Sequence, residues 1–350
     1  KALSKNGQGC VIFTFSARNI SKSLATHPFF PKPWRINEKF RFHSTNGKRN
    51  KDDIDNYAPL RSLSSSIPEV TLKINSGNKD KVDKELFQIL NPYYYSQTPV
   101  IVKSINEKSK ACKKWSDLEY LLEKVGANTE CDIELGYGSY ASDETYQRAN
   151  ITFGDYVTYL SMMSEAYYNE NKNKQPSTPT AYLAQNSIFP SLLSDFHIPS
   201  FIDGSHAGCL AEGRKKCSGK NNYLGQGKKY NTMFWCGPKD CVSPLHYDPL
   251  DNLFLHFVGR KSFILYPPML ENKNEDYYAG VNGQQYNTCP IDVEKGTEKV
   301  YKQYPLFKNV ARKGQIGIVN PGDLLFVPSK WWHFVRSIDH FNISVNVWWR

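Results

Sequence analysis

The stretch SPLHYDPLDNLFLHFVGRKSFILYPP spans residues 243–268 and decides the fold. It contains two short apolar runs, residues 252–258 and 261–268, with Gly259 and Arg260 between them. Runs of this length, rich in Phe, Leu, Ile and Val and separated by turn residues, predict two β-strands joined as a hairpin. The stretch therefore predicts a β-rich centre for the chain.

The sequence after this stretch continues as short apolar segments at 314–320, 324–328, 333–338 and 342–349. Turn signals separate them, such as the Asn-Pro-Gly-Asp run at residues 320–323. Short strands at a spacing of about ten residues predict a double-sheet jelly roll of the cupin type.

The sequence before the deciding stretch mixes helices and strands. Its apolar patterns predict strands at 98–104, 131–136 and 181–185, and helices at 116–122 and 151–163. Ser116 and Thr152 are the expected N-cap residues of the two helices.

We expect three regions. Residues 1–67 show no sustained period and are expected to form a basic, flexible extension. Residues 68–180 form a mixed α/β part that supports the core and lines the substrate cleft. Residues 181–350 form the double-stranded β-helix, or cupin-like jelly-roll, core. The predicted fold class is mainly β with flanking helices.

The net charge is +10, and residues 1–50 carry ten Lys and Arg against one acidic residue, Glu38. No zinc finger or RNP motif accompanies this charge, so a solvated basic surface is favoured over nucleic-acid binding. Eight Cys without a C-x-x-C pair favour reduced thiols and an intracellular location, the nucleus or cytoplasm. The acid-poor opening resembles a mitochondrial transit peptide, which makes the mitochondrion the alternative. No apolar run approaches the ~18 residues of a membrane span.

His246 and Asp248 are candidate metal ligands. Residues two apart in a strand point to the same face, so both side chains can reach one ion. Two His and one carboxylate form the facial triad of non-haem Fe(II) oxygenases, although the pair alone also suits Mn(II) or Zn(II). His333, which follows Trp331 and Trp332, is the expected third ligand. The alternatives are an exposed turn for the pair and a core histidine for His333.

Lys261 opens the strand after Gly259-Arg260. An inward-facing Lys in an apolar barrel needs an anion, and a dicarboxylate such as 2-oxoglutarate would supply one; the alternative is a Lys facing solvent. Ser243 and Asn252 flank the metal pair and add hydrogen-bonding groups. In the last strand, one face is predicted to be polar and to line a pocket through Asn342, Ser344, Asn346 and Trp348.

These motifs together resemble the Jumonji-C domain of the 2-oxoglutarate- and Fe(II)-dependent oxygenases. The matching segments are WCGPKDCVSPLHYDP (235–249), GRKSFILYPP (259–268), NPGDLLFVPSKWWHFV (320–335) and SVNVWW (344–349). Upstream, TPVIVKS, IELG and AYLAQ are similar to the protein-hydroxylase branch, closest to its arginyl hydroxylase group. The similarity covers about residues 85–349.

The resemblance implies roles for individual residues. The residues that match the iron ligands are His246, Asp248 and His333. Those that match co-substrate contacts are Tyr182, Ser243, Asn252 and Lys261, and the matching aromatic pocket walls are Trp235 and Trp348. Glu134 matches an acidic residue that can hold a substrate guanidinium. Tyr146 stands where that group carries Trp, and the loop 203–230 is longer and more basic; both place the substrate's identity in question.

The activity implied is that of a dioxygenase with Fe(II) as its cofactor and 2-oxoglutarate and O2 as co-substrates. Its substrate would be a protein or peptide, hydroxylated on an arginine side chain. N-methyl-lysine demethylation, a cupin-like binding protein without turnover, and hydroxylation of a tRNA base through the basic loop 209–230 stay open as alternatives. The sequence predicts no oligomeric state.

Overall fold

The computed structural model describes residues 65–72, 78–136, 147–169, 180–203, 223–268, 287–294 and 297–350. Most of the predicted extension at 1–67 and of the loop 203–230 lies outside these ranges, and so does Tyr146. The location in the cell and the role of the basic loop therefore stay predictions.

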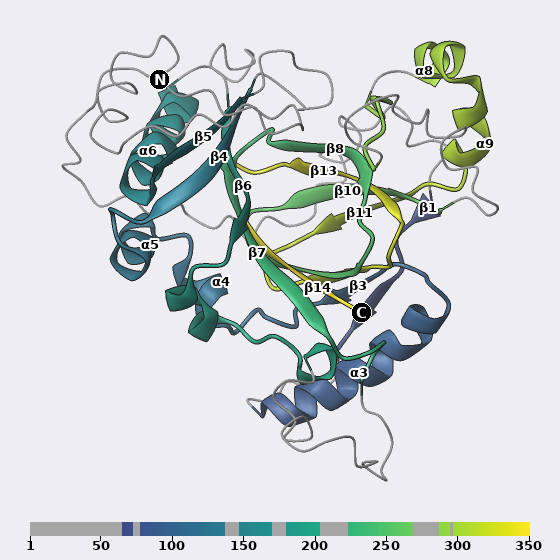
Figure 1. The fold of residues 1–350 in the computed structure, drawn as a ribbon, viewed down its shortest axis with the longest axis horizontal. Helices are drawn as coiled ribbons and strands as arrows, with labels where there is room; N and C mark the ends of the chain where they lie inside the picture. Colours follow the sequence, from purple (N-terminus) through teal and green to yellow (C-terminus); the bar gives the residue numbers. More distant parts are fainter. Residues whose placement is uncertain are drawn as a thin grey trace, which may run out of the picture.

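Two β-sheets face each other, and helices lie around them (Figure 1). The strands of the smaller sheet are β1 (Ser65–Ser66), β8 (Val242–Tyr247), β10 (Lys261–Tyr266), β11 (Gln315–Val319) and β13 (Trp332–Ser337). Those of the larger sheet are β2 (Glu69–Thr71), β3 (Val100–Lys103), β4 (Glu130–Gly136), β5 (Gln147–Thr152), β6 (Thr180–Ser187), β7 (Lys229–Pro238), β9 (Asp251–Val258), β12 (Leu324–Val327) and β14 (Phe341–Trp349).

The strand orders are β1-β11-β10-β13-β8 in the smaller sheet and β2-β3-β12-β9-β14-β7-β6-β4-β5 in the larger one. Four strands of each, β11-β10-β13-β8 and β12-β9-β14-β7, form the two walls of a jelly roll. This confirms the predicted double-stranded β-helix, with the smaller and larger sheets as its two layers. Strands β6, β4 and β5 continue the larger sheet beyond β7 at one edge, and β3 and β2 continue it beyond β12 at the other.

The hairpin predicted for residues 252–258 and 261–268 is wrong. Strand β9 pairs with β12 and β14, whereas β10 pairs with β11 and β13, so consecutive strands lie in opposite sheets. Gly259 makes the crossing possible: its φ is +72°, and a Cβ there would lie 2.3 Å from the Phe341 carbonyl oxygen. A hairpin and a crossing between sheets have the same apolar pattern, because that pattern does not show which strands pair with each other.

Every residue of β9 is buried, because both of its faces are covered. Leu253 and Leu255 pack in the outer core layer between the larger sheet and the helices, whereas Phe254 packs in the inner layer between the two sheets. A third apolar layer, which includes Phe307 and Phe334, lies between the smaller sheet and the segment 289–311. The space between the sheets is therefore reached by alternate residues of each jelly-roll strand.

The helices are α3 (Lys79–Tyr95), α4 (Lys110–Lys114), α5 (Leu118–Val125), α6 (Phe153–Asn169), α8 (Thr297–Gln303) and α9 (Lys308–Ala311), with 3-10 turns η2 (Pro190–Asp195), η3 (Ser200–Ile202) and η5 (Pro305–Phe307). Thr152 caps α6 as predicted, because its hydroxyl accepts a hydrogen bond from the Asp155 N–H at 3.1 Å. The cap of α5 is Asp117 and not Ser116. The Asp117 carboxylate accepts hydrogen bonds from two N–H groups of the first turn, at 3.1 and 3.2 Å.

The mixed α/β part shares its sheet with the core, since β4 pairs with β6 across the expected boundary at residue 180. The division into regions at 68–180 and 181–350 stays a prediction. None of the described helices has both the length and the apolar character needed to cross a bilayer. The cysteines described as free are Cys112, Cys131, Cys236, Cys241 and Cys289.

We expect Gly259→Ala to lower the free energy of unfolding by about 3 kcal/mol, because it adds a positive-φ penalty to a backbone clash. Gly126→Ala is the matched control: Gly126 has a φ of +90°, but the nearest atom to its Cβ is Thr129 Oγ1 at 3.3 Å. That control should lose only about 1–2 kcal/mol. Urea denaturation of both variants measures the difference, and equal losses would show that the crossing at Gly259 is not sterically constrained.

Candidate active site

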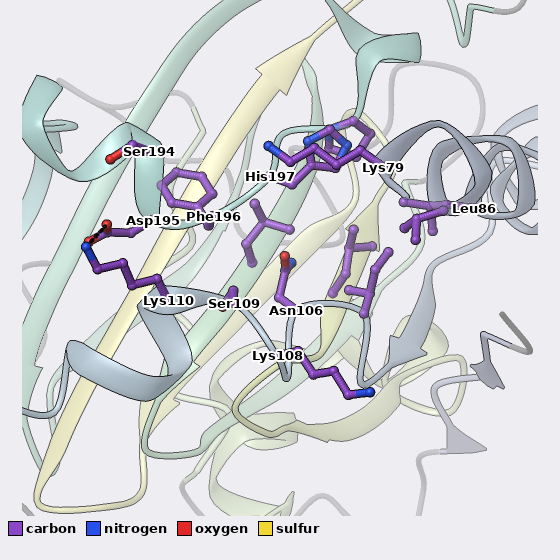
Figure 2. Close-up of a pocket in the computed structure, with 15 residues that line it drawn as sticks. Lys79, Leu86, Asn106, Lys108, Ser109, Lys110, Ser194, Asp195, Phe196 and His197 are labelled. Carbon is purple, nitrogen blue, oxygen red and sulfur yellow. Dashed lines mark ion pairs between the residues drawn. The ribbon is translucent and has the colours of Figure 1, made fainter. Parts of the chain in front are cut away.

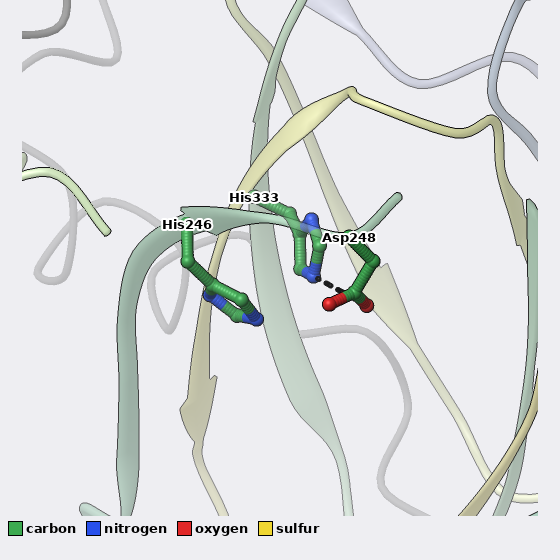
Figure 3. Close-up of side chains that lie close together, drawn as sticks. All are labelled: His246, Asp248 and His333. Atoms are coloured by element: carbon green, nitrogen blue, oxygen red, sulfur yellow. Dashed lines mark ion pairs between the residues drawn. The ribbon is translucent and has the colours of Figure 1, made fainter. Parts of the chain in front are cut away.

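The predicted metal ligands converge between the ends of β8 and β13. His246 and His333 lie opposite each other in the pairing of these strands, and Asp248 follows one residue after β8 ends. Their ligand atoms all lie within 4.8 Å of one another. The His333 Nε2 atom is 3.7 Å from Asp248 Oδ2, and Figure 3 shows the three side chains close together. The structure thus brings together a His–Asp–His cluster that could hold a metal ion.

Backbone carbonyls set the tautomer of both imidazoles. His246 Nδ1 is 2.7 Å from the Pro244 carbonyl oxygen, and His333 Nδ1 is 2.9 Å from the Trp331 carbonyl oxygen. A carbonyl only accepts, so each Nδ1 carries the hydrogen and leaves the Nε2 lone pair for an ion. Burial, with the neighbouring His246 second, lowers the pKa of His333, which keeps its imidazole neutral as metal binding requires.

The carboxylate of Asp248 is also held in place. Trp348 donates a hydrogen bond from Nε1 to Asp248 Oδ2 at 2.9 Å, and the Lys330 N–H donates to the Asp248 carbonyl oxygen at 2.7 Å. Trp348 was expected as a pocket wall, and here it orients a ligand as well. Two imidazoles that turn Nε2 toward the cluster and one oriented carboxylate form a donor set that fits Fe(II).

Lys261 faces the space between the sheets and is 2% exposed. Its ammonium donates hydrogen bonds to the Tyr182 hydroxyl at 2.9 Å and to Ser344 Oγ at 3.2 Å. It also lies 5.6 Å from the ring centre of Phe254, and no carboxylate among the described residues pairs with it. Burial lowers the pKa of Lys261 to about 8. A buried cation without a counter-ion marks a place where an anion can bind.

Several polar atoms of the inner surface lack partners among the described residues. They are Asn252 Oδ1, Asn346 Oδ1 and Trp235 Nε1, and all three are buried. Native proteins satisfy most buried polar atoms, so this group indicates that a ligand completes the surface. On β14 the polar face is as predicted: Ser344 contacts Lys261 and Trp348 contacts Asp248, whereas Val345 packs in the outer layer.

Ser243 reaches the metal face through an irregularity in β8. It lies three residues before His246, a spacing that would put the two side chains on opposite faces of a regular strand. In the structure Ser243 lies opposite Val335, and His246 lies opposite His333. The three-residue separation in β8 therefore spans the same length as a two-residue separation in β13. This β-bulge puts Ser243 and His246 on the same face of the strand.

Glu134, the expected substrate contact, is already paired. Its Oε1 accepts a hydrogen bond from Arg148 Nη2 at 2.8 Å, and the two residues lie opposite each other in β4 and β5. On its other side Glu134 lies opposite Tyr182, whose hydroxyl contacts Lys261. Opposed residues in a sheet share a face, so Arg148, Glu134 and Tyr182 form a row that leads to Lys261.

Sequence reasoning missed some of these contacts. Arg148 gives no signal until the register of β4 against β5 is known, and the same holds for Ser344 as a partner of Lys261. The carbonyl groups of Pro244 and Trp331 each lie two residues before a ligand histidine, a local spacing that could have been noticed. The roles assigned to the site residues remain predictions.

Known proteins are similar to this chain over the same region. A family model described as a cupin-like domain matches residues 86–350. Lysine-specific demethylase 8 of Xenopus tropicalis is 28% identical over 260 residues, which cover 73% of this chain and 49% of that protein. Lysine-specific demethylase JMJ30 of Arabidopsis thaliana is 28% identical over 263 residues, covering 74% and 52%. Jumonji C domain-containing protein 5 of Drosophila melanogaster is 30% identical over 300 residues, covering 84% and 64%.

The chain thus spans about half to two thirds of the length of these relatives. The matched region contains the whole jelly roll and the His–Asp–His cluster at its centre. Fold, ligand set and similarity agree. The chain belongs to the cupin-like Jumonji-C family of Fe(II)- and 2-oxoglutarate-dependent oxygenases.

Proposed function

We propose that this chain hydroxylates a side chain of a protein substrate, with arginine as the first candidate, by using Fe(II), 2-oxoglutarate and O2. The observation that carries the proposal is the buried ammonium of Lys261, which has no carboxylate partner among the described residues. A dicarboxylate co-substrate would supply that partner. Of the unpaired atoms, the Trp235 Nε1–H can donate to a carboxylate, whereas the Oδ1 atoms of Asn252 and Asn346 are acceptors and need a donor.

Each residue has a defined part in this proposal. His246, Asp248 and His333 would hold Fe(II), which when bound supplies the activation of O2 coupled to decarboxylation of the 2-oxo acid. Lys261 would bind the distal carboxylate together with Tyr182 and Ser344. Trp348 keeps the Asp248 carboxylate in one orientation, and the apolar inner layer between the sheets would help to exclude water.

The choice of arginine depends on Glu134. A carboxylate can form a bidentate pair with a guanidinium, and Arg148 already donates one hydrogen bond of 2.8 Å to Glu134. A substrate arginine would have to replace Arg148, whose side chain is 49% exposed. The Glu134 side chain is only 11% exposed, so the incoming guanidinium must supply a contact of similar strength.

N-methyl-lysine demethylation is the second candidate, and two observations favour it. Two of the relatives are named lysine-specific demethylases. The pairing of Glu134 with Arg148 also leaves that wall without net charge, and a methylammonium does not need a bidentate carboxylate. A cupin-like protein without turnover is less well supported, because both His333 and Lys261 face the pocket.

We expect His246→Ala to weaken Fe(II) or Mn(II) binding at least about 100-fold, since it removes one of the predicted ligands. Anaerobic calorimetric titration of the purified full chain with the metal ion measures the affinity. His340→Ala, which changes a histidine outside the cluster, is the matched control and should bind metal as the wild type does. Unchanged affinity in His246→Ala would remove this residue from the metal site.

We expect Lys261→Met to weaken 2-oxoglutarate binding roughly 10- to 100-fold, because the distal carboxylate loses a charged hydrogen bond. Binding of 2-oxobutyrate, which lacks that carboxylate, should change little in the same variant. The affinity of the wild type for 2-oxoglutarate should also fall above pH 8, where Lys261, with a pKa of about 8, loses its proton. A pH dependence that is retained in Lys261→Met would contradict the assignment.

Mass spectrometry of a peptide library with Arg, Lys and methyl-lysine at one position tests the reaction itself. Protein hydroxylation predicts the added mass of one oxygen on arginine peptides, and demethylation predicts loss of a methyl group with release of formaldehyde. For arginine peptides, Arg148→Gln should lower KM, because Glu134 becomes free, and Glu134→Gln should raise it. Turnover of methyl-lysine peptides alone would replace the arginine proposal with the demethylase one.

A further inference from the structure

A second cavity of about 300 Å³ lies outside the candidate active site (Figure 2). Leu255 of β9 and Leu324 of β12 contribute to its lining, and both belong to the outer core layer. Their strand neighbours Phe254 and Leu325 belong to the inner layer. The cavity therefore lies against the outer face of the same sheet whose inner face surrounds the candidate metal cluster.

The charged lining of this cavity is predominantly cationic. Lys79 starts α3, Lys108 precedes α4, and Lys110 starts α4; all three are exposed. The acidic residue of the described lining is Asp195, which is 2% exposed. Its Oδ2 accepts hydrogen bonds from Trp115 Nε1 at 2.9 Å and from the Tyr120 hydroxyl at 2.8 Å. An incoming ligand therefore meets more positive than negative charge.

The polar group in the middle of the cavity is Asn106. Its side chain is buried, with 7% of the residue exposed, and its amide has no hydrogen-bond partner among the described residues. Figure 2 shows Asn106 among the lining residues, between the segment of Phe196 and the α4 start. Its amide atoms are not among the fully buried polar atoms that lack a partner, so they reach the cavity, where a ligand oxygen or N–H group can bind them.

The rest of the lining is mostly apolar, with Ser109, Ser194 and His197 as its other polar residues. It includes Val82 and Leu86 of α3, Ile105, Phe196 and the two leucines of the larger sheet. An inorganic anion has no apolar area to bury against such a surface, whereas an aliphatic or aromatic group does. The volume is at the lower end of the range for small-molecule sites.

We propose that this cavity binds a small organic carboxylate, with its charged end toward Lys79 and Lys110 and its apolar body against Leu86, Leu255 and Leu324. The site is separate from the candidate active site, and the proposal does not depend on the proposed reaction. The Lys110 ammonium is 3.8 Å from Asp195 Oδ1, and its side chain is half exposed. An ammonium has three N–H donors, so Lys110 can keep this contact and still donate to a ligand carboxylate.

The test uses the full chain and 4-phenylbutyrate as the probe, with binding followed by calorimetry and by saturation-transfer NMR. We expect saturable binding of the probe and none of 4-phenylbutylamine, which has the same apolar body and the opposite charge. The double variant Lys79→Gln/Lys110→Gln should bind the probe about fivefold more weakly, the loss expected for two exposed charged contacts. Adding Asn106→Leu to this double variant should weaken binding of the probe further.

Two controls locate the binding. Lys84→Gln/Lys113→Gln removes two exposed lysines from the same helices, outside the cavity lining, and should leave the affinity unchanged. Lys261→Met should also leave it unchanged, which would exclude binding in the candidate active site. The proposal is overturned by absence of saturable binding, by equal weakening in the two lysine pairs, or by loss of binding in Lys261→Met.

Discussion

The pairing of β8 with β13 is the interaction on which the rest of the site depends. It sets His246 opposite His333, and the bulge in β8 brings Ser243 to the same face. The carbonyl group that orients His246 is that of Pro244 in β8, and the one that orients His333 is that of Trp331 in the turn before β13. Asp248 comes two residues after His246, so the position of β8 also sets the position of Asp248. One antiparallel pair thus brings together a His–Asp–His cluster that could hold a metal ion, from segments about ninety residues apart in the sequence.

The electrostatics of the site divide into two parts. The inner part holds the cation Lys261, which has no carboxylate partner in the described part of the chain and whose burial is unfavourable unless an anion joins it. The outer part, Glu134 with Arg148, is already neutral within the chain. In the proposed function, Lys261 pairs with an anion from solution, whereas Glu134 exchanges Arg148 for a substrate group. Co-substrate binding and substrate choice in that function therefore depend on different charges, Lys261 in the smaller sheet and the Glu134–Arg148 pair in the larger one.

Much of this was predictable from short-range sequence. The His-x-Asp pair, the polar face of β14 and the inward Lys261 depend on the two-residue period of a strand, which the sequence displays directly. The partner of each strand does not appear in that period, so the hairpin at 252–268 was predicted where the chain crosses between sheets. Arg148 and the cavity near Asn106 likewise depend on which distant segments meet. Asp117 replaced Ser116 as a cap because both are good acceptors one residue apart.

The two-residue crossing at Gly259-Arg260 has a consequence for chain length. Strand β10 presents alternate side chains to the interior, and Lys261 is its first residue. If one residue inserted into the crossing shifted β10 by one position, this alternation would invert: the ammonium would point outward, and Ser262 would face inward where Phe263 lies now. Such an insertion would remove the proposed anion site even though the residues around it would keep their types.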